Sequence, residues 1–563
     1  MSDPGILKKG ALTSATYDTV LQIGLRIMSF VLNAFIVRQV SRESFAVMTV
    51  RLHLLYSTGL LLSREAFRRA ALSSKGSKEI YKVINLLWMG TLVSLPVGLL
   101  GWYIWMYVME QPPESVTRHY SYGVLLILTS VVTEVTAEVP FVLAELQLWS
   151  KTKVVIEGVM QLLRSLLLAL FVFLWPMHSV LVFGISQMLG SIVYSVSYYI
   201  VFLRALRGKE DSSLPIHEFN QLLPKWSNGK MLPEVDHELG LLSWSFFKQG
   251  WLKETLTEGE HYIMNFFPLI SLNQQGVYQV VNNLGSLAAR LIFRSIEAAA
   301  YKYFAQMLYR GKSIKDQDQS RVAEVSRFFL SLFSNLILVS LLIITFGWSY
   351  SRTVLQIYGG SQLSDDDGTL LMRAQCFYVV FLAVNGITEA YTFAVMDDAE
   401  LSRYNKMLVI FSFVYMGCAV FFTWCFGAVG FIIANALNMA LRINHSLRFI
   451  SDQYKDSEYQ PLQIDWISAR PFFVFASCLA LTTVSEAVLY PRSIILHITF
   501  GLLCLIWVAY LLRMEFKAVF EKLFDITDSC IRKLIGEGSL GNIFNPMVIT
   551  KYLRRFLYGC TKK

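Results

Sequence analysis

The sequence predicts an all-α polytopic membrane protein with about 14 transmembrane helices, arranged as two pseudo-symmetric six-helix lobes, two further C-terminal helices and a central cavity. Of the 563 residues, 54% are hydrophobic and 16% are charged, which is too apolar for a soluble chain of this length. Apolar segments of close to the roughly 20 residues that cross a bilayer recur along the chain. The net charge of +9 accompanies no nucleic-acid-binding motif, so it indicates basic loops beside a membrane.

The first six helices form an N-terminal lobe, residues 1–204. They are expected near 15–37, 44–63, 82–109, 120–147, 153–176 and 179–203. The first segment follows a polar N-terminus and carries Arg26 near its middle, so we expect a retained helix rather than a cleaved signal peptide. A polar linker, residues 205–240, contains three prolines and separates the lobes.

The second lobe spans residues 241–450. Its helices are expected near 241–268, 276–301, 322–347, 369–396, 406–425 and 427–449. Residues 451–512 hold two extra helices, near 467–489 and 493–512. The basic and aromatic residues 513–563 predict an amphipathic tail on the cytosolic leaflet.

Loop charges predict cytosolic N- and C-termini. With that orientation, lysine and arginine gather in successive cytosolic loops, while the opposite side carries few of them and holds the acidic run at 365–367. A miscounted helix would have reversed this bias partway along the chain.

A weak internal repeat links the two lobes. RIMSF at 26–30 is similar to YIMNF at 262–266. In each half the next helix carries arginines four positions apart, and Glu65 and Glu297 follow closely. The arginines are Arg64 with Arg68, and Arg290 with Arg294. Because residues four apart share one helical face, each pair could grip a phosphate or carboxylate; the alternative is that they only mark a cytosolic loop.

Several longer segments carry a family resemblance. They are SFVLNAF at 29–35, VRLHLLYS at 50–57, SREAFRRA at 63–70, SFFKQGWLKETLTEGEHY at 245–262 and GVYQVVNNLGSLAARLIF at 276–293. These segments resemble the signatures of the Rft family, in the superfamily of bacterial lipid II flippases and multidrug exporters. The resemblance implies a multi-pass endoplasmic-reticulum protein of N-glycosylation. It also implies that the protein flips a dolichyl-diphosphate-linked mannose/GlcNAc oligosaccharide to the lumenal leaflet, in possible contact with the N-glycosylation machinery.

The expected substrate site is a cavity between the lobes, open to the cytosol, where arginines hold the diphosphate. The arginines are Arg26, Arg64, Arg68, Arg290 and Arg294. Supporting charge partners are Glu65, Glu258, Glu260, His261 and Glu297. Partly desolvated arginines grip a diphosphate better than one exposed charge would.

Two carboxylates on the fourth helix, Glu134 and Glu138, share a face. They are expected to neutralise arginines such as Arg26 or Arg164, because an ionised group at bilayer depth costs at least roughly 2.5–3.5 kcal/mol. A proton relay is the alternative.

Other functions stay open at this point. A non-flipping carrier or accessory protein would need the same cavity, and an ion-coupled exporter would need unpaired cavity carboxylates. A membrane glycosyltransferase would need metal-binding acids, for which 365–367 is a weak match. The seven cysteines show no metal or disulfide spacing, and no ATP motif or nucleophile–base pair occurs, so neither an enzyme nor a cofactor or metal is expected.

Overall fold

The computed structural model describes most of the chain. The described residues are 24, 28–73, 80–113, 116, 119–147, 149–208, 218–225, 235–267, 269–288, 293–455, 457–461 and 469–512. Their regular secondary structure is entirely helical. Within them, nine helices are long and apolar enough to cross a bilayer, or ten if one bent pair is a single span. The all-α polytopic membrane fold is therefore confirmed, while the count of 14 helices stays a prediction.

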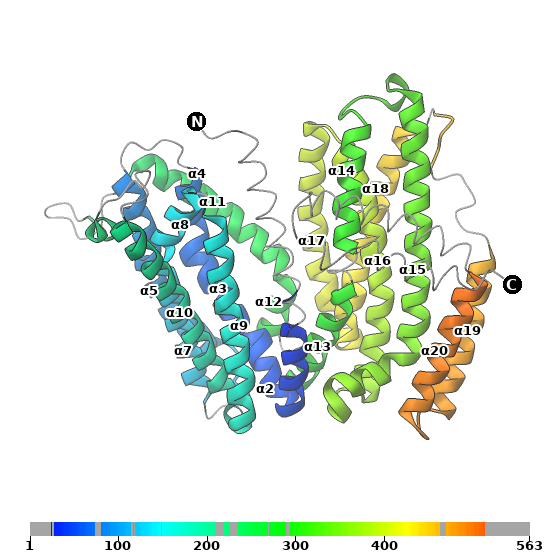
Figure 1. Ribbon diagram of the computed structural model, residues 1–563, viewed down its shortest axis with the longest axis horizontal. Coiled ribbons are helices and arrows are strands. Elements are labelled where there is room, and N and C mark those ends of the chain that lie inside the picture. The colour runs from blue at the N-terminus through cyan, green and yellow to red at the C-terminus, as the bar shows by residue number, and fades with distance from the viewer. Residues whose placement is uncertain are drawn as a thin grey trace. The chain divides into compact units, whose positions relative to one another are not determined.

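The first group of helices, here called the N-lobe, ends at Gly208 (Figure 1). Residues 28–39 are helical. One span follows, made of α2 (Arg42–Ala46), η1 (Val47–Leu52), α3 (His53–Leu60), η2 (Leu61–Glu65) and α4 (Ala66–Ser73). The remaining helical elements of the N-lobe are α5 (Ile80–Tyr103), η3 (Ile104–Val108), α7 (Tyr120–Val135), α8 (Glu138–Leu146), α9 (Ser150–Leu174), η4 (Pro176–His178) and α10 (Ser179–Gly208). Helix α10 packs against α7 and α9, and α5 packs against α7.

Helices α7 and α8 are bent by 41° at a two-residue break. Pro140 causes the break, because proline has no N–H to donate to the carbonyl of Thr136 four residues earlier. That carbonyl instead accepts the hydroxyl of Tyr199 on α10, at 2.7 Å. The bend sets Glu134 and Glu138 on either side of a fixed corner.

The second group, here called the C-lobe, begins at α11 (His237–Thr257) after the short η5 (Phe219–Leu222). It continues through α12 (Gly259–Phe266), α13 (Leu272–Ala288), α14 (Arg294–Met307), η7 (Ile314–Asp316), α15 (Gln319–Gly359), η8 (Gly360–Gln362), α16 (Asp366–Val395), α17 (Asp398–Phe426) and α18 (Val429–Gln453). Helices α15, α16 and α18 pack in sequence, and α17 packs on α18 (Figure 1).

The acidic run at 365–367 begins a helix. Asp365 is the N-cap of α16, and its carboxylate accepts the backbone N–H of Gly368 at 2.8 Å. Carboxylates in a first turn also stabilise the positive end of the helix dipole. Among the described residues there is no cluster of three metal-binding side chains, there or elsewhere.

Contacts join the two lobes at several places. Helix α11 packs against α4 and η2, and α13 packs against both α2 and α16. An ion pair connects Arg42 to Asp365 at 2.6 Å, and Arg38 Nε donates to the carbonyl of Tyr358 at 3.1 Å. The helices on either side of the polar linker thus share one compact unit, residues 21–464.

Gly276 is expected to be essential for this contact between α13 and α2. A Cβ atom at position 276 would meet the backbone carbonyl of Arg42, which cannot rotate away. We expect Gly276→Ala to lower the free energy of unfolding by roughly 1–3 kcal/mol, measured as a lower Tm in detergent. Gly417→Ala on α17 is the matched control, since its Cβ would meet nothing within 4 Å. Equal melting temperatures for the two variants would contradict a tight α2–α13 contact.

The C-terminal pair, α19 (Ala469–Val488) and α20 (Ile494–Leu511), belongs to a second compact unit. Arg470 Nη2 donates to the carbonyl of Leu511 at 2.7 Å. The buried side chains of Ser485 and His497 are hydrogen bonded at 2.8 Å. These two helices match the predicted extra pair, and the predicted amphipathic tail lies outside the described residues.

Candidate functional site

The N-lobe holds a buried ionic cluster, here called the first Arg–Glu cluster, made of Arg64, Arg68, Glu134 and Glu138. Arg64 Nη1 lies 2.7 Å from Glu134 Oε1, and its Nε lies 3.7 Å from Glu138. Arg68 grips Glu138 with two hydrogen bonds, at 2.8 and 2.5 Å. The carboxylates are almost fully buried, at 5% and 2% side-chain exposure. Two positive and two negative charges make the cluster neutral.

Further side chains add contacts to this cluster. The hydroxyl of Tyr56 donates to Glu134 at 2.6 Å, and Ser191 donates to the same carboxylate at 3.3 Å. The guanidinium of Arg68 also lies 3.8 Å from the ring centroid of Phe141. Ser191 lies on α10, while Tyr56 lies on the same span as the two arginines and Phe141 lies on α8 with Glu138. These contacts and the ion pairs let the mostly buried charges stay ionised.

A small cavity adjoins the first Arg–Glu cluster. Its volume is about 280 Å³, and Glu157, Gln161 and Arg164 line it together with both arginines. Arg164 donates to Gln187 at 2.9 Å. Glu134 and Glu138 were expected to neutralise Arg26 or Arg164, but the structure pairs them with Arg64 and Arg68, the arginines predicted to hold substrate.

The C-lobe carries a second Arg–Glu cluster, made of Glu389, Arg442, Tyr404 and Asn385. Arg442 donates to both oxygens of Glu389, at 2.8 and 2.7 Å. The hydroxyl of Tyr404 adds a bond of 2.6 Å, and the Asn385 amide adds one of 3.0 Å. Glu389 is only 4% exposed. Each lobe therefore contains a buried glutamate held by a bidentate arginine: Glu138 by Arg68 in the N-lobe, and Glu389 by Arg442 in the C-lobe.

The other predicted site residues are dispersed. Glu65 pairs with Arg69 at 2.8 Å on their own helix. Glu258 bonds His261 at 2.7 Å, and Glu260 accepts from Asn435 on α18 at 2.9 Å.

The second predicted arginine pair is described only in part. Arg294 begins α14 with an exposed side chain. Glu297 lies against Gly386 of α16: a Cβ atom added at position 386 would lie 3.2 Å from the Glu297 carboxylate. Arg26 and Arg290 lie outside the described residues.

Glu389 and Arg442 were not among the predicted site residues. Each lies inside a predicted helix, 369–396 and 427–449. An acid inside one predicted membrane helix and a base inside another are the signal that could have found them, because charges at bilayer depth must be paired.

The comparisons with known proteins decide the family. A family model described as "Rft protein" matches residues 10–525. The chain belongs to the Rft family. An Rft relative from Xenopus tropicalis is 40% identical over 503 residues, and one from Mus musculus is 40% identical over 505 residues. Each alignment covers 87% of this chain and 92% of the relative. A Drosophila melanogaster relative is 33% identical over 495 residues, 81% of this chain and 88% of its own. All three are named "Man(5)GlcNAc(2)-PP-dolichol translocation protein RFT1".

Solved structures of two transport proteins share this fold. The lipid II flippase MurJ, in an inward closed conformation, matches with a TM-score of 0.54 at 11% identity, covering 88% of this chain and 99% of MurJ. An inward-facing MATE transporter of the MOP superfamily matches with a TM-score of 0.50 at 13% identity, covering 78% and 99%. The predicted resemblance to the Rft family and to the flippase-like fold is thus confirmed.

Proposed function

We propose that this Rft protein moves a dolichyl-diphosphate-linked mannose/GlcNAc oligosaccharide from the cytosolic to the lumenal leaflet of the endoplasmic reticulum membrane. The observation that carries the proposal is its 40% identity, over 87% of the chain, to relatives named for the translocation of Man(5)GlcNAc(2)-PP-dolichol. The protein acts as a transporter without catalysing a covalent step, and its termini face the cytosol.

The buried clusters give each lobe a rigid centre. Because the first Arg–Glu cluster is neutral and hydrogen bonded, Arg64 and Arg68 act as internal counter-ions that hold the second helix against the fourth. Two well-formed lobes can rock against one another as units, which is how transporters built from repeats alternate access. We therefore propose that Arg64 and Arg68, two of the five predicted arginines, do not bind the diphosphate.

The diphosphate is then bound by the remaining arginines. Arg294 is exposed at the start of α14, and the sequence assigns Arg26 and Arg290 to the same site. Charge-assisted bonds from arginine forks are the strongest contacts a diphosphate can make.

A reconstituted flipping assay tests the proposal. Purified protein is placed in vesicles that contain the dolichyl-diphosphate oligosaccharide, and a sugar-binding protein added outside reports the exposed lipid. We expect the exposed fraction to change only in vesicles with protein. Arg294→Gln should slow this change by about tenfold, the value of one charge-assisted bond. Lys302→Gln, an exposed cation on the same helix, is the matched control and should leave the rate unchanged.

Vesicles with and without protein that behave alike would sink the translocation proposal. If such protein still bound the lipid, the carrier function would replace it. Equal rates for Arg294→Gln and Lys302→Gln would instead remove Arg294 from the diphosphate site.

A further inference from the structure

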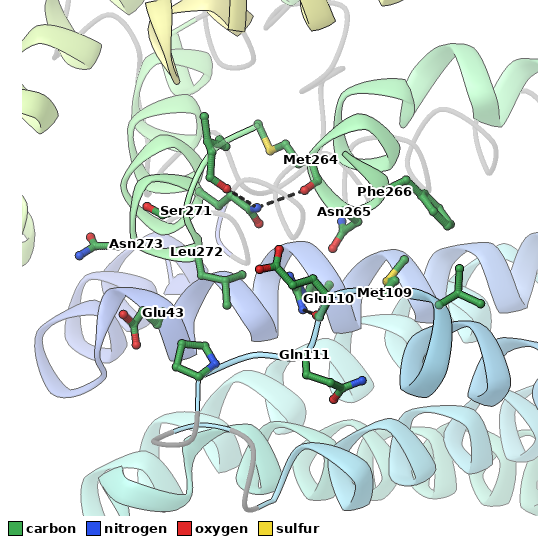
Figure 2. Close-up of a pocket in the computed structure, with 15 residues that line it drawn as sticks. Glu43, Met109, Glu110, Gln111, Met264, Asn265, Phe266, Ser271, Leu272 and Asn273 are labelled. Carbon is green, nitrogen blue, oxygen red and sulfur yellow. Dashed lines mark hydrogen bonds between the residues drawn. The ribbon is translucent and has the colours of Figure 1, made fainter. Parts of the chain in front are cut away.

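A second and larger cavity lies between the N-lobe and the first helices of the C-lobe, away from both Arg–Glu clusters. Its volume is about 700 Å³, within the range of roughly 300–1,000 Å³ common for small-molecule sites. Its walls come from the segments 43–51, 108–113 and 264–275. Figure 2 shows Glu110 and Asn265 extending toward one another across it, with Glu43 and Asn273 at one end and Met109 and Phe266 at the other.

Three side chains lining this cavity are more than nine-tenths buried and have polar atoms without a partner among the described residues. They are Arg51, Asn265 and Gln275, at 3%, 5% and 2% exposure. The unpartnered atoms are Arg51 Nε, Asn265 Oδ1 and Gln275 Oε1. Buried polar atoms are nearly always hydrogen bonded, so these three are placed to bond polar groups of a molecule or water that enters the cavity.

The amide nitrogens of two of these side chains are already used. Asn265 Nδ2 donates to the carbonyl of His261 at 2.7 Å. Gln275 Nε2 donates to the carbonyls of Met264 and Ile270, at 3.1 and 3.2 Å. Both amides are thereby fixed with their oxygens available as acceptors, while Arg51 offers one donor.

The charge of the cavity excludes an anion as its ligand. Glu43 and Glu110 contribute two carboxylates, while Arg51 contributes one guanidinium, which also donates to the backbone carbonyl of Glu110. A diphosphate would be repelled by this net negative wall. A neutral molecule rich in hydroxyl groups fits, since each hydroxyl both donates and accepts.

Apolar surface completes the match. The ring of Phe266 lines the cavity, is 44% exposed and packs edge-on against buried Trp105, at 6.4 Å between centroids. Flat apolar faces beside convergent polar groups suit a sugar ring, whose faces carry C–H groups and whose rim carries hydroxyls.

We propose that this cavity binds sugar residues of the neutral oligosaccharide part of the lipid-linked substrate, separately from its diphosphate. The inference rests on the proposed function. Its segments belong to loops and helix ends that the charge pattern assigns to the lumenal side, so the sugars are received there while the diphosphate still lies among arginines. Two separate subsites for head group and sugars let the oligosaccharide be handed across in steps.

The test uses the full-length protein in detergent and the free, lipid-less Man(5)GlcNAc(2) oligosaccharide as probe, with binding followed by saturation-transfer NMR. Wild-type protein is expected to bind it. Leu272→Trp, which fills the cavity without removing a hydrogen bond, should weaken binding at least tenfold. Leu370→Trp is the matched control, because Leu370 is 52% exposed on α16 and should bind as wild type.

A second variant guards against misfolding. Glu110→Ala removes one exposed cavity carboxylate and should weaken binding severalfold. Absence of oligosaccharide binding to wild type would overturn the inference, as would unchanged binding in Glu110→Ala and Leu272→Trp. Inorganic pyrophosphate should not compete, and its competition with the oligosaccharide on wild-type protein would also overturn the inference.

Failure of this inference is distinguishable from failure of the proposed function. Oligosaccharide binding that is lost in Leu272→Trp, in a protein that moves no lipid in vesicles, would leave the sugar site standing without translocation. Lipid movement in vesicles, by a protein that does not bind the free oligosaccharide, would support translocation and overturn the sugar site.

Discussion

Arg68→Glu is expected to prevent accumulation of the folded protein. The change puts a third carboxylate beside Glu138 and Glu134, all three removed from water, and deletes the two bonds that Arg68 donates. Breaking one buried ion pair in this way costs about 3–5 kcal/mol, a large part of the stability of a domain. The measurement is the yield of monodisperse protein in detergent and its Tm.

The matched control is Arg69→Glu on the next position. Within the described part of the chain, Arg69 pairs with Glu65, and both side chains are about one-third exposed, at 35% and 30%. An exposed pair is worth less than about 1 kcal/mol, so this variant should fold normally. The double variant Arg68→Glu with Glu138→Arg restores opposite charges and should recover much of the lost stability.

The same variants separate a structural role from a substrate role. If the charge-swapped protein folds and still moves lipid, Arg68 acts as a counter-ion. A single Arg68→Glu variant that folds like wild type, but no longer moves the lipid, would contradict that role and return Arg68 to the diphosphate site.

Glu389→Leu is expected to destabilise the C-lobe by a similar amount, about 3–5 kcal/mol. Arg442 would lose both of its carboxylate bonds, and Tyr404 and Asn385 would lose an acceptor. The expected observation is a lower Tm, or a lower yield of soluble protein in detergent.

Removing both charges is expected to be far milder than removing one. A double variant, Glu389→Leu with Arg442→Leu, leaves no unpaired ion and should regain most of the stability, since buried pairs replaced by apolar residues are often neutral or stabilising. A double variant as unstable as Glu389→Leu alone would show that the ion pair is not what holds these helices.

Much of the fold could be predicted from the sequence because membrane helices leave a local signal. Where the structure describes the chain, the predicted helices after the first have helical counterparts, and most of their boundaries agree within a few positions. Helix α15 is the main exception, since it runs to Gly359, well past the predicted end at 347. Its last turns include buried Ser349, Ser351 and Thr353, which lowered the local hydropathy although they face the protein interior.

The pairing of charges could not be predicted, because it depends on which helices are neighbours. The spacing of Arg64 with Arg68 and of Glu134 with Glu138 showed that each pair shares a face. Nothing local showed that the second helix packs beside the fourth, or that Pro140 turns the two glutamates toward these arginines. The polar cavity of Figure 2 could not be predicted either, since its walls come from three segments that are distant in sequence.

The first Arg–Glu cluster also sets an order for biosynthesis. Each arginine is made 70 residues before the glutamate that neutralises it. At translation rates of about 5–20 residues per second, the second helix waits roughly 4–14 seconds for its counter-charges. In the C-lobe the order is reversed, with Glu389 emerging 53 residues ahead of Arg442. Neither cluster can therefore become neutral until the second of its two charged helices has left the ribosome.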